Sequence, residues 1–482
     1  MAFLRFIEVK VKMEVLESLM TYLNENFAPV ELVFIGILGE AIFFLVFAKA
    51  LLFIARKLRL ISQKKYQESI VLKASKRKRK QLIYSSLSVA AVIMMLMIGY
   101  RISWQQGNDV KQWQRGTIGH LTLEADKQIE SYVREQDIRD LCVGIIKEEQ
   151  TYSTCLSQSP DEDKFELDGS AIFEIGSISK TFTYAAMLVV LDRHNVKLDS
   201  SIGPFLPRQI AKKNPALARV TWHQLANHTS GLSRMPNDWN WTTVSTQLEF
   251  LSFGDASKDF TTDYVYQYLA SAQLVKGQGP SYSNLAVGLL GLLLSDLEHK
   301  SYAQLIDDYV VSPLNLTTTQ TGDFIDAENA VEGYGKYRRM GNIVISTKSQ
   351  QWTFSDALAG AGAIDSSLND MMVFLDDRMQ AYQQAVFQQA EYMVSSKKSS
   401  AKVNLGWIVS SLSPELNTSM VFHDGATGGF RSFIGFDESS ETGVVILVNG
   451  TRGVIPLGKD ILTLLADKSV ASAQTARSIA IH

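Results

Sequence analysis

The stretch FEIGSISKTF, residues 173–182, together with the apolar run 183–191, decides how the rest of the chain is interpreted. Gly176 allows a tight turn, and the apolar positions after it recur at helical spacing. The pattern therefore predicts that Ser177 lies at the first turn of a mostly buried helix. Lys180 follows three positions later, so its side chain would lie over the same face of that helix.

This spacing has a chemical meaning, because a serine hydroxyl attacks well only when a neighbouring base takes its proton. Burial would push Lys180 toward the neutral amine, and a helix N-terminus would favour negative charge at Ser177. The Ser-x-x-Lys pattern alone is common, and its simpler interpretation is a capping serine followed by a surface lysine. The assignment of a catalytic pair therefore depends on the rest of the chain.

Two further motifs follow in the same chain. The triplet YSN, residues 282–284, comes after GQGP and before the apolar run 285–294, which indicates a loop leading into a buried helix. The triplet HDG, residues 423–425, precedes ATGGF and lies shortly before the strand-like segment 444–449.

Together these motifs resemble those of the serine β-lactamase and penicillin-binding-protein superfamily. The similarity is to its class C-like branch, which contains β-lactamases, D-Ala-D-Ala carboxypeptidases, D-aminopeptidases and esterases. Supporting segments are LDS (198–200), TWHQLANHTSGL (221–232), and GAGAI (360–364) with NDMM (369–372), where a glycine turn before a late helix is expected. The resemblance covers roughly residues 119–466. It implies an α+β fold, with an antiparallel sheet flanked by helices, a helical subdomain, and a site between them.

The resemblance also implies roles for the catalytic residues. Ser177 would attack a carbonyl carbon, with Lys180 and Tyr282 sharing the proton transfers, and which of the two is the principal base stays open. Asn284 would orient Lys180 and hydrogen-bond a substrate amide.

The third motif would form the opposite wall of the site. The backbone N–H groups of Ser177 and Ala426 would form an oxyanion hole. His423 would line the wall, and Gly425 would let substrate approach the edge of the strand.

The third motif departs from the pattern of penicillin-recognising members, which usually carry Lys-Thr-Gly or Lys-Ser-Gly. A lysine is cationic at neutral pH, whereas a histidine with an ordinary pKa of about 6.5 is mostly neutral there. The charge that would hold a carboxylate is therefore weakened at His423. The sequence favours esters or D-amino-acid amides as substrates over β-lactams.

The N-terminal part of the chain predicts membrane insertion. Residues 1–103 carry a net charge of +9 and the remainder −12. Two segments, 32–55 and 82–100, are apolar over the length that a bilayer requires, and the first of them contains Glu40. A strongly basic stretch separates the two segments. The excess of Lys and Arg places that loop in the cytoplasm. Everything after Arg101 is then outside it.

We therefore expect four regions. They are an N-terminal segment at 1–31 without an assigned role, two transmembrane helices with a basic cytoplasmic loop at 32–103, a linker at 104–118, and a hydrolase domain at 119–482. A charged amphipathic helix is expected at 122–140.

The two cysteines lie on predicted neighbouring strands, 142–147 and 151–156. If Lys147 pairs with Gln150, Cys142 lies opposite Cys155 on the same face, where a disulfide could form outside the cytoplasm. The intervening Glu148-Glu149 turn lacks glycine, so two buried free thiols remain the alternative.

The sequence thus predicts a membrane-anchored, extracytoplasmic serine hydrolase that cleaves an amide or ester, with no metal or other cofactor. The partner would be a small-molecule or peptide substrate, with a cell-wall fragment as one option, and not nucleic acid. The oligomeric state is not predicted. One alternative is a class C-like β-lactamase or D-Ala-D-Ala carboxypeptidase. Another is a catalytically silent membrane sensor or cell-wall binding protein.

Overall fold

A computed structural model describes residues 102–466, with gaps at 107–110, 117–119, 137, 149, 159–166, 238–253, 256, 276–278, 323–327, 341–342, 385–393, 396–400, 414–415 and 440. The chain divides into units 1–94 and 95–482, and all described residues belong to the second. The predicted N-terminal segment, both predicted membrane spans and the basic loop lie outside the described residues. Within the described residues, none of the helices combines the length and the apolar character needed to cross a membrane.

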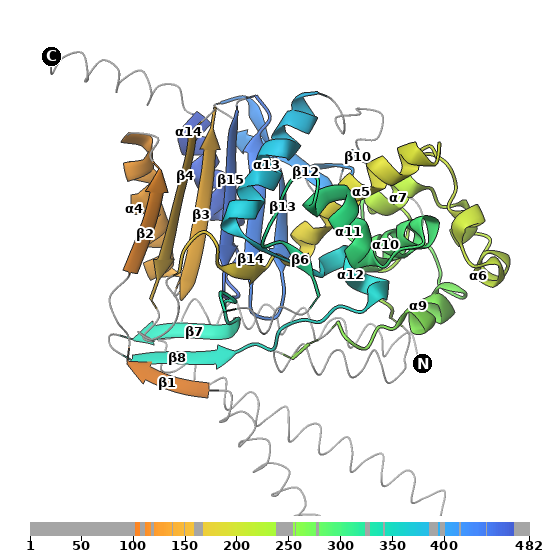
Figure 1. The fold of residues 1–482 in the computed structure, drawn as a ribbon, viewed down its shortest axis with the longest axis horizontal. Coiled ribbons are helices and arrows are strands. Elements are labelled where there is room, and N and C mark those ends of the chain that lie inside the picture. Colours follow the sequence, from red (N-terminus) through yellow and green to blue (C-terminus); the bar gives the residue numbers. More distant parts are fainter. Residues whose placement is uncertain are drawn as a thin grey trace, which may run out of the picture. The chain divides into compact units, whose positions relative to one another are not determined.

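A nine-stranded antiparallel sheet forms the centre of the described unit, in the order β10-β11-β12-β13-β14-β15-β3-β4-β2 (Figure 1). Its strands are β2 (Lys111–Gly116), β3 (Asp140–Lys147), β4 (Gln150–Ser157), β10 (Val394–Ser395), β11 (Lys402–Asn404), β12 (Trp407–Ser413), β13 (Thr418–Ala426), β14 (Arg431–Asp437) and β15 (Thr442–Val448).

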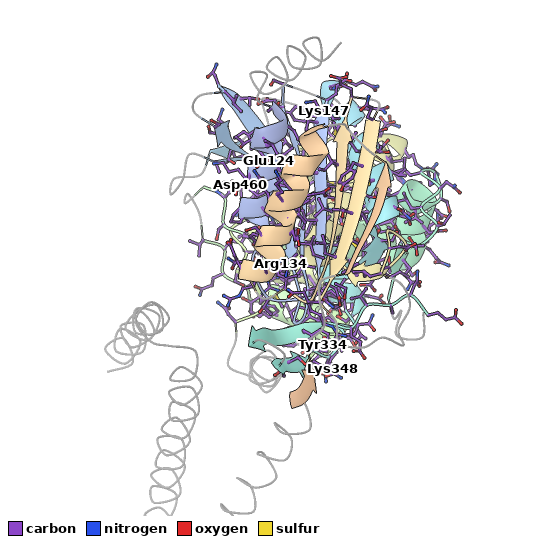
Figure 2. All side chains as sticks on the ribbon, turned by 90° about the vertical axis from the view of Figure 1, so that its left-hand side faces the viewer. Glu124, Arg134, Lys147, Tyr334, Lys348 and Asp460 are labelled. Carbon is purple, nitrogen blue, oxygen red and sulfur yellow. A yellow bond between two sulfur atoms is a disulfide. The ribbon has the colours of Figure 1, made fainter. Side chains whose placement is uncertain are left out.

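The two faces of this sheet are covered by different helices, and the alternation along β3 shows how. Leu141, Val143 and Ile145 point into a cluster beneath α4 (His120–Glu135) and α14 (Ile455–Ala466). Cys142 and Ile146 point to the other face, which α13 (Leu368–Gln383) and the helical region cover. Figure 2 shows α4 lying along the sheet, with Glu124 and Arg134 on its exposed side. The predicted antiparallel sheet flanked by helices is confirmed.

The helical region beside the sheet is built around α5 (Ser179–Arg193) and α10 (Asn284–Glu298), which are both mostly buried. Among the described residues, the other helices of at least five residues in this region are α6 (Arg208–Lys213), α7 (Trp222–Ala226), α9 (Thr262–Leu269), α11 (Tyr302–Ile306), the π-helix η5 (Asp307–Val311) and α12 (Asp356–Gly362). Short 3₁₀ turns complete it at η3 (Gly203–Phe205) and η4 (Leu217–Arg219). Both predicted buried helices are confirmed.

Glycines bring α10 and α12 unusually close together. A Cβ atom on Gly288 would lie 2.3 Å from the Ala357 carbonyl oxygen, and one on Gly360 would lie 2.8 Å from the Val287 carbonyl oxygen. The segment 360–364 was expected to form a glycine turn. It is instead the end of α12 followed by β9 (Ile364–Ser367), and Gly360 serves the contact with α10 rather than a turn.

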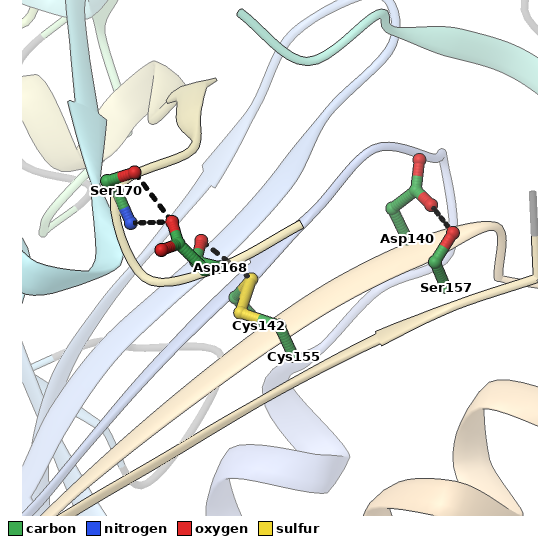
Figure 3. Close-up of a disulfide and its surroundings, with 6 residues drawn as sticks. All are labelled: Asp140, Cys142, Cys155, Ser157, Asp168 and Ser170. Atoms are coloured by element: carbon green, nitrogen blue, oxygen red, sulfur yellow. Dashed lines mark hydrogen bonds between the residues drawn. A yellow bond between two sulfur atoms is a disulfide. The ribbon is translucent and has the colours of Figure 1, made fainter. Parts of the chain in front are cut away.

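The first hairpin has the predicted register, in which Lys147 pairs with Gln150 and Cys142 with Cys155. The two cysteines form a disulfide (Figure 3). Glu148 supplies the turn with a φ of 54°, and its N–H donates to the Glu441 carbonyl oxygen at 2.7 Å. A contact from outside the hairpin thus helps hold a turn that lacks glycine.

Two local expectations are wrong. The segment predicted as a linker contributes two strands: β1 (Ile102–Gln106) joins β8 (Ile343–Lys348) and β7 (Tyr334–Met340), and β2 forms the edge of the large sheet beside β4. The helix expected at 122–140 ends at Glu135, and Asp140 begins β3. In both cases the deciding hydrogen bonds are made to strands distant in sequence, which a local pattern does not reveal.

Candidate active site

The segment that carries Ser177 is a sharp turn between a short strand and a helix. β5 (Ile172–Glu174) pairs with β9, which also pairs with β6 (Gln320–Thr321). The chain then turns at Gly176, with a φ of 51°, into the 3₁₀ turn η2 (Gly176–Ile178) and directly into α5. This confirms the predicted turn and places Ser177, partly exposed, at the start of a buried helix.

The end of β13 lies directly against this turn. A Cβ atom on Gly176 would lie 2.7 Å from the Ala426 nitrogen, and one on Gly425 would lie 2.0 Å from the Ile175 carbonyl oxygen. The Ser432 hydroxyl donates to that same Ile175 oxygen at 2.7 Å. Gly425 was expected to leave room for substrate. The protein's own backbone fills that space, so Gly425 allows β13 to approach Ser177.

Lys180 is fully buried and hydrogen-bonded to the candidate nucleophile. Its Nζ atom donates to Ser177 Oγ at 3.0 Å and to the carbonyl oxygen of Ala361, in α12, at 2.7 Å. Burial, and secondarily the charge of Arg234, hold the pKa of Lys180 well below its usual range, while Asp424 opposes the shift. These contacts exclude the simpler interpretation of Lys180 as a surface residue.

Tyr282 lies in the loop before α10 and is the third residue of the group that includes Ser177 and Lys180. Ser283 caps that helix by accepting the Ala286 N–H at 2.9 Å, which fixes the adjacent Tyr282. The Lys180 Nζ atom lies 4.8 Å from the centre of the Tyr282 ring, and the phenol hydrogen-bonds with Ser177. Burial raises the pKa of Tyr282, so the phenol keeps its proton at neutral pH.

Asn284 lies at the first position of α10, but it does not orient Lys180 as expected. Its Nδ2 atom donates to the Met235 sulfur at 3.6 Å, and its buried Oδ1 atom has no hydrogen-bond partner among the described residues. The two hydrogen bonds of Lys180 go to Ser177 and Ala361 instead. The Ala361 carbonyl group in α12 thus takes the orienting role that was predicted for Asn284.

His423 lies on β13 beside this group and is 1% exposed. Its Nδ1 atom lies 2.7 Å from the Asp424 carbonyl oxygen, which can only accept, so Nδ1 carries the proton and Nε2 a lone pair. Burial, and secondarily the charge of Lys180, lower the pKa of His423 to about 3. The imidazole is therefore neutral at physiological pH.

Asp424 carries a carboxyl group within electrostatic range of Lys180, Arg234 and Arg431. Burial raises its pKa, and its own backbone and the three cations oppose the shift. The third motif therefore contributes a neutral imidazole and an acidic group, and no cation.

Two residues that the sequence did not single out as site residues lie against Tyr282. The ring of His228 is centred 4.5 Å from the Tyr282 ring, and its Nδ1 atom accepts the Ser283 N–H at 3.2 Å. The guanidinium of Arg234 lies 4.9 Å from the centre of the same ring. His228 stands within the signature 221–232, which could have indicated it, but no sequence signal pointed to Arg234.

The structure thus brings together Ser177, Lys180, Tyr282, His423 and Ala426 from three segments distant in sequence. An antiparallel sheet with helices on both faces and a Ser-Lys-Tyr group at its strand edge is the arrangement of a serine hydrolase.

Comparison with known proteins places this hydrolase more narrowly. A family model described as Beta-lactamase matches residues 125–467, so the chain belongs to the β-lactamase family. "Protein flp" of Staphylococcus aureus (strain MW2) is 23% identical over 347 residues, which cover 70% of this chain and 65% of that protein. The match thus spans less than two thirds of that relative.

Two other relatives carry enzymatic names. The "D-alanyl-D-alanine-carboxypeptidase/endopeptidase AmpH" of Escherichia coli (strain K12) is 25% identical over 301 residues, covering 58% of this chain and 71% of AmpH. A "Beta-lactamase" of Psychrobacter immobilis is 23% identical over 396 residues, covering 76% of this chain and 90% of that protein.

Solved structures share the fold. A class C β-lactamase from Rhodobacter sphaeroides has a TM-score of 0.56 at 19% identity, covering 72% of this chain and 99% of that one. A β-lactamase/D-alanine carboxypeptidase from Pseudomonas syringae has a TM-score of 0.57 at 17% identity, covering 72% and 98%. These likenesses confirm the predicted α+β architecture of the hydrolase region.

Proposed function

We propose that this protein hydrolyses an amide or ester outside the cytoplasm through an acyl-enzyme on Ser177. The observation that carries the proposal is the 3.0 Å hydrogen bond between Ser177 Oγ and a lysine that is 0% exposed. A buried amine is an effective base only if its pKa lies near the working pH, and the burial of Lys180 acts in that direction.

Lys180, rather than Tyr282, is then the principal base. The same burial that favours the neutral amine of Lys180 disfavours the phenolate of Tyr282. A protonated phenol beside Ser177 is suited to pass a proton onward. The two residues therefore divide the proton transfers instead of competing for one role.

In the proposed reaction, the Ser177 hydroxyl proton moves to Lys180 Nζ while Oγ attacks the carbonyl carbon. The C–O or C–N bond to the leaving group breaks, and that group takes a proton through Tyr282. Water then attacks the acyl ester with the same base assisting, and Ser177 regains its proton.

The negative charge on the carbonyl oxygen would be held by the backbone N–H groups of Ser177 and Ala426. The close approach of Gly176 to Ala426, which leaves 2.7 Å between a built Cβ atom and the Ala426 nitrogen, supports this pairing. Preorganised donors of this kind commonly contribute the largest single share of catalysis.

The proposed substrates are short-chain esters or D-amino-acid amides and peptides, cell-wall derived in one version, rather than β-lactams. Support comes from the neutral His423, which cannot attract a carboxylate as a lysine does. His423→Lys is expected to improve binding of carboxylate-bearing ligands. Efficient cephalosporin hydrolysis by the unmodified protein at neutral pH would favour the β-lactamase alternative.

The decisive experiment is labelling of Ser177. A fluorophosphonate should modify the purified protein and give a labelled peptide containing Ser177, and the Ser177→Ala variant should remain unlabelled. Labelled penicillin is the parallel probe. If neither reagent reacts with the unmodified protein, the catalytically silent sensor or binding protein becomes the better interpretation.

We also propose that segments 32–55 and 82–100 span a membrane and place the hydrolase region on its outer side. Support comes from their apolar length and from the basic stretch between them. Reporter fusions after Lys80 and after Trp104 should report opposite sides of the membrane. A cytoplasmic signal from both would contradict this topology.

A further inference from the structure

The positively charged side chains around the site do not lie on β13. An anionic group on a substrate needs a positive partner that is accessible to it, since a charge is held in a partly dry site only when paired. The two charged or titratable side chains that β13 offers are the neutral His423 and the acidic Asp424. An anion therefore finds no partner on that wall.

Two of the three Lys and Arg side chains around the site are already engaged. Lys180 is buried and directs its hydrogen bonds to Ser177 and Ala361. Arg431, on β14, donates through Nη1 to the carbonyl oxygens of Thr427 at 2.8 Å and Phe430 at 2.6 Å. Its guanidinium thereby holds the turn between β13 and β14.

Arg234 differs from both because its side chain is exposed. In the part of the chain that the structure describes, its guanidinium forms no ion pair; its one direct contact is with the Tyr282 ring, 4.9 Å away. Its charge nevertheless reaches into the site, because it lowers the pKa values of Lys180 and His228.

The backbone of Arg234 fixes its position. Its carbonyl oxygen accepts the N–H groups of Asn284 at 2.9 Å and Leu285 at 3.2 Å, at the start of α10. The guanidinium is thus carried on a segment tied to the same helix end that positions Tyr282. Stacking on an aromatic ring leaves the N–H donors at the edge of a guanidinium free for a planar anion.

We infer that Arg234 binds a carboxylate of the substrate at the solvent side of the site, beside Tyr282; this rests on the proposed hydrolase function. The carboxylate-binding charge would then stand on the segment after residues 221–232 instead of on the third motif. Among the esters and amides proposed as substrates, those carrying a carboxylate would be preferred over neutral ones of the same shape, whereas the third motif would still lack the cation typical of penicillin-recognising members.

Two matched pairs of esters test this inference. In the first pair, 3-acetoxybenzoate and its methyl ester differ by a charge on the leaving group. In the second, 4-nitrophenyl succinate and 4-nitrophenyl butyrate differ by a charge on the acyl group. The unmodified protein should show a lower KM for the charged member of at least one pair.

In Arg234→Gln, the KM of that charged ester should rise about tenfold or more, which is the loss expected for one charge-assisted hydrogen bond. The KM of its neutral partner should change less than about twofold, and Arg234→Lys should retain part of the preference. Arg208→Gln, which removes an exposed cation from α6, is the matched control and should leave both values unchanged.

Equal losses for charged and neutral esters in Arg234→Gln would overturn the inference, because they would mean a purely structural or tuning role. A selective loss in Arg431→Gln instead would move the carboxylate site to β14 and also overturn it.

Calorimetry in the Ser177→Ala background separates this inference from the proposed function, since binding is then measured without turnover. If Arg234→Gln lowered the affinity for the charged ester but not for the neutral one, this would support the inference even if the unmodified protein hydrolysed nothing. Equal affinities for charged and neutral esters, with and without Arg234, would reject it.

Discussion

The two faces of the nine-stranded sheet differ in what they bury. Beneath α4 and α14 lies an apolar cluster that includes Ile129, Phe433 and Leu462. The opposite side buries a larger apolar cluster. That side also contains two buried basic side chains, the fully buried Lys180 and the almost fully buried His423.

This difference indicates which face the protein maintains for chemistry. Burying an amine or an imidazole with an unpaired nitrogen costs stability, whereas apolar contacts increase it. The apolar face therefore contributes most to the free energy of unfolding, whereas the buried polar groups on the other face lower it. Changes on the two faces should affect different measured quantities.

The largest expected effect is that of Lys180→Met, which keeps an unbranched side chain but removes the base. We expect kcat for ester hydrolysis to fall by about 10²–10⁴-fold, the usual share of a general base. The unfolding free energy should stay the same or rise by up to about 2 kcal/mol, because a buried amine has been replaced by an apolar group.

Initial rates and chemical denaturation measure the two quantities, with Lys212→Met on the exposed side of α6 as control. Retained activity together with a lower unfolding free energy would show that Lys180 has a structural role, and the comparison of the two faces would then fail.

The next effect concerns the apolar face. Leu462, in α14, is 0% exposed, and Leu462→Ala should lower the unfolding free energy by about 2–5 kcal/mol through lost contacts and a cavity. The kcat and KM values, measured well below the unfolding transition, should match those of the unmodified protein. Leu375→Ala, equally buried in α13 on the site face, is the comparison. A change in kcat for Leu462→Ala alone would mean that the apolar face is coupled to the site.

The smallest effect is a pH dependence on the site face. Glu174 ends β5, is 3% exposed, and accepts the Trp352 N–H at 3.2 Å. Burial raises its pKa from 4.5 to about 8, with hydrogen bonds from Thr427 and Trp352 opposing the shift and Asp255 adding to it. Between these two values the native protein keeps a proton that the unfolded chain releases. Stability from this group is therefore complete below pH 4.5 and is lost as the pH rises through 8.

Glu174→Gln keeps a neutral acceptor at this position and removes the titration. We expect it to raise the unfolding free energy by on the order of 1–2 kcal/mol at pH 8 and to leave it unchanged at pH 4. Denaturation at a series of pH values measures this, with the exposed Glu328→Gln as control. A gain at pH 4 as large as that at pH 8 would contradict a titration effect.

The sequence by itself determined the parts of the molecule that depend on neighbours in the chain. Turn residues and apolar spacing predicted the tight turn at Gly176, the buried helix after Ser177 and the one after Tyr282. The register of the first hairpin, with Cys142 opposite Cys155, also followed from counting residues across a short turn. Resemblance to a family then indicated that these separate motifs meet in one site.

Only the tertiary structure decided what surrounds those residues. The strands at 102–106 and 111–116 depend on partners far away in the chain, and the space beside Gly425 is filled by Ile175, 250 positions earlier. The pKa values of Lys180 and His423 depend on burial, and the place of Arg234 beside Tyr282 depends on how its loop meets α10. Periodicity and turn chemistry act over a few residues, whereas desolvation and charge act through space, so a motif names the reacting groups and the fold sets their chemistry.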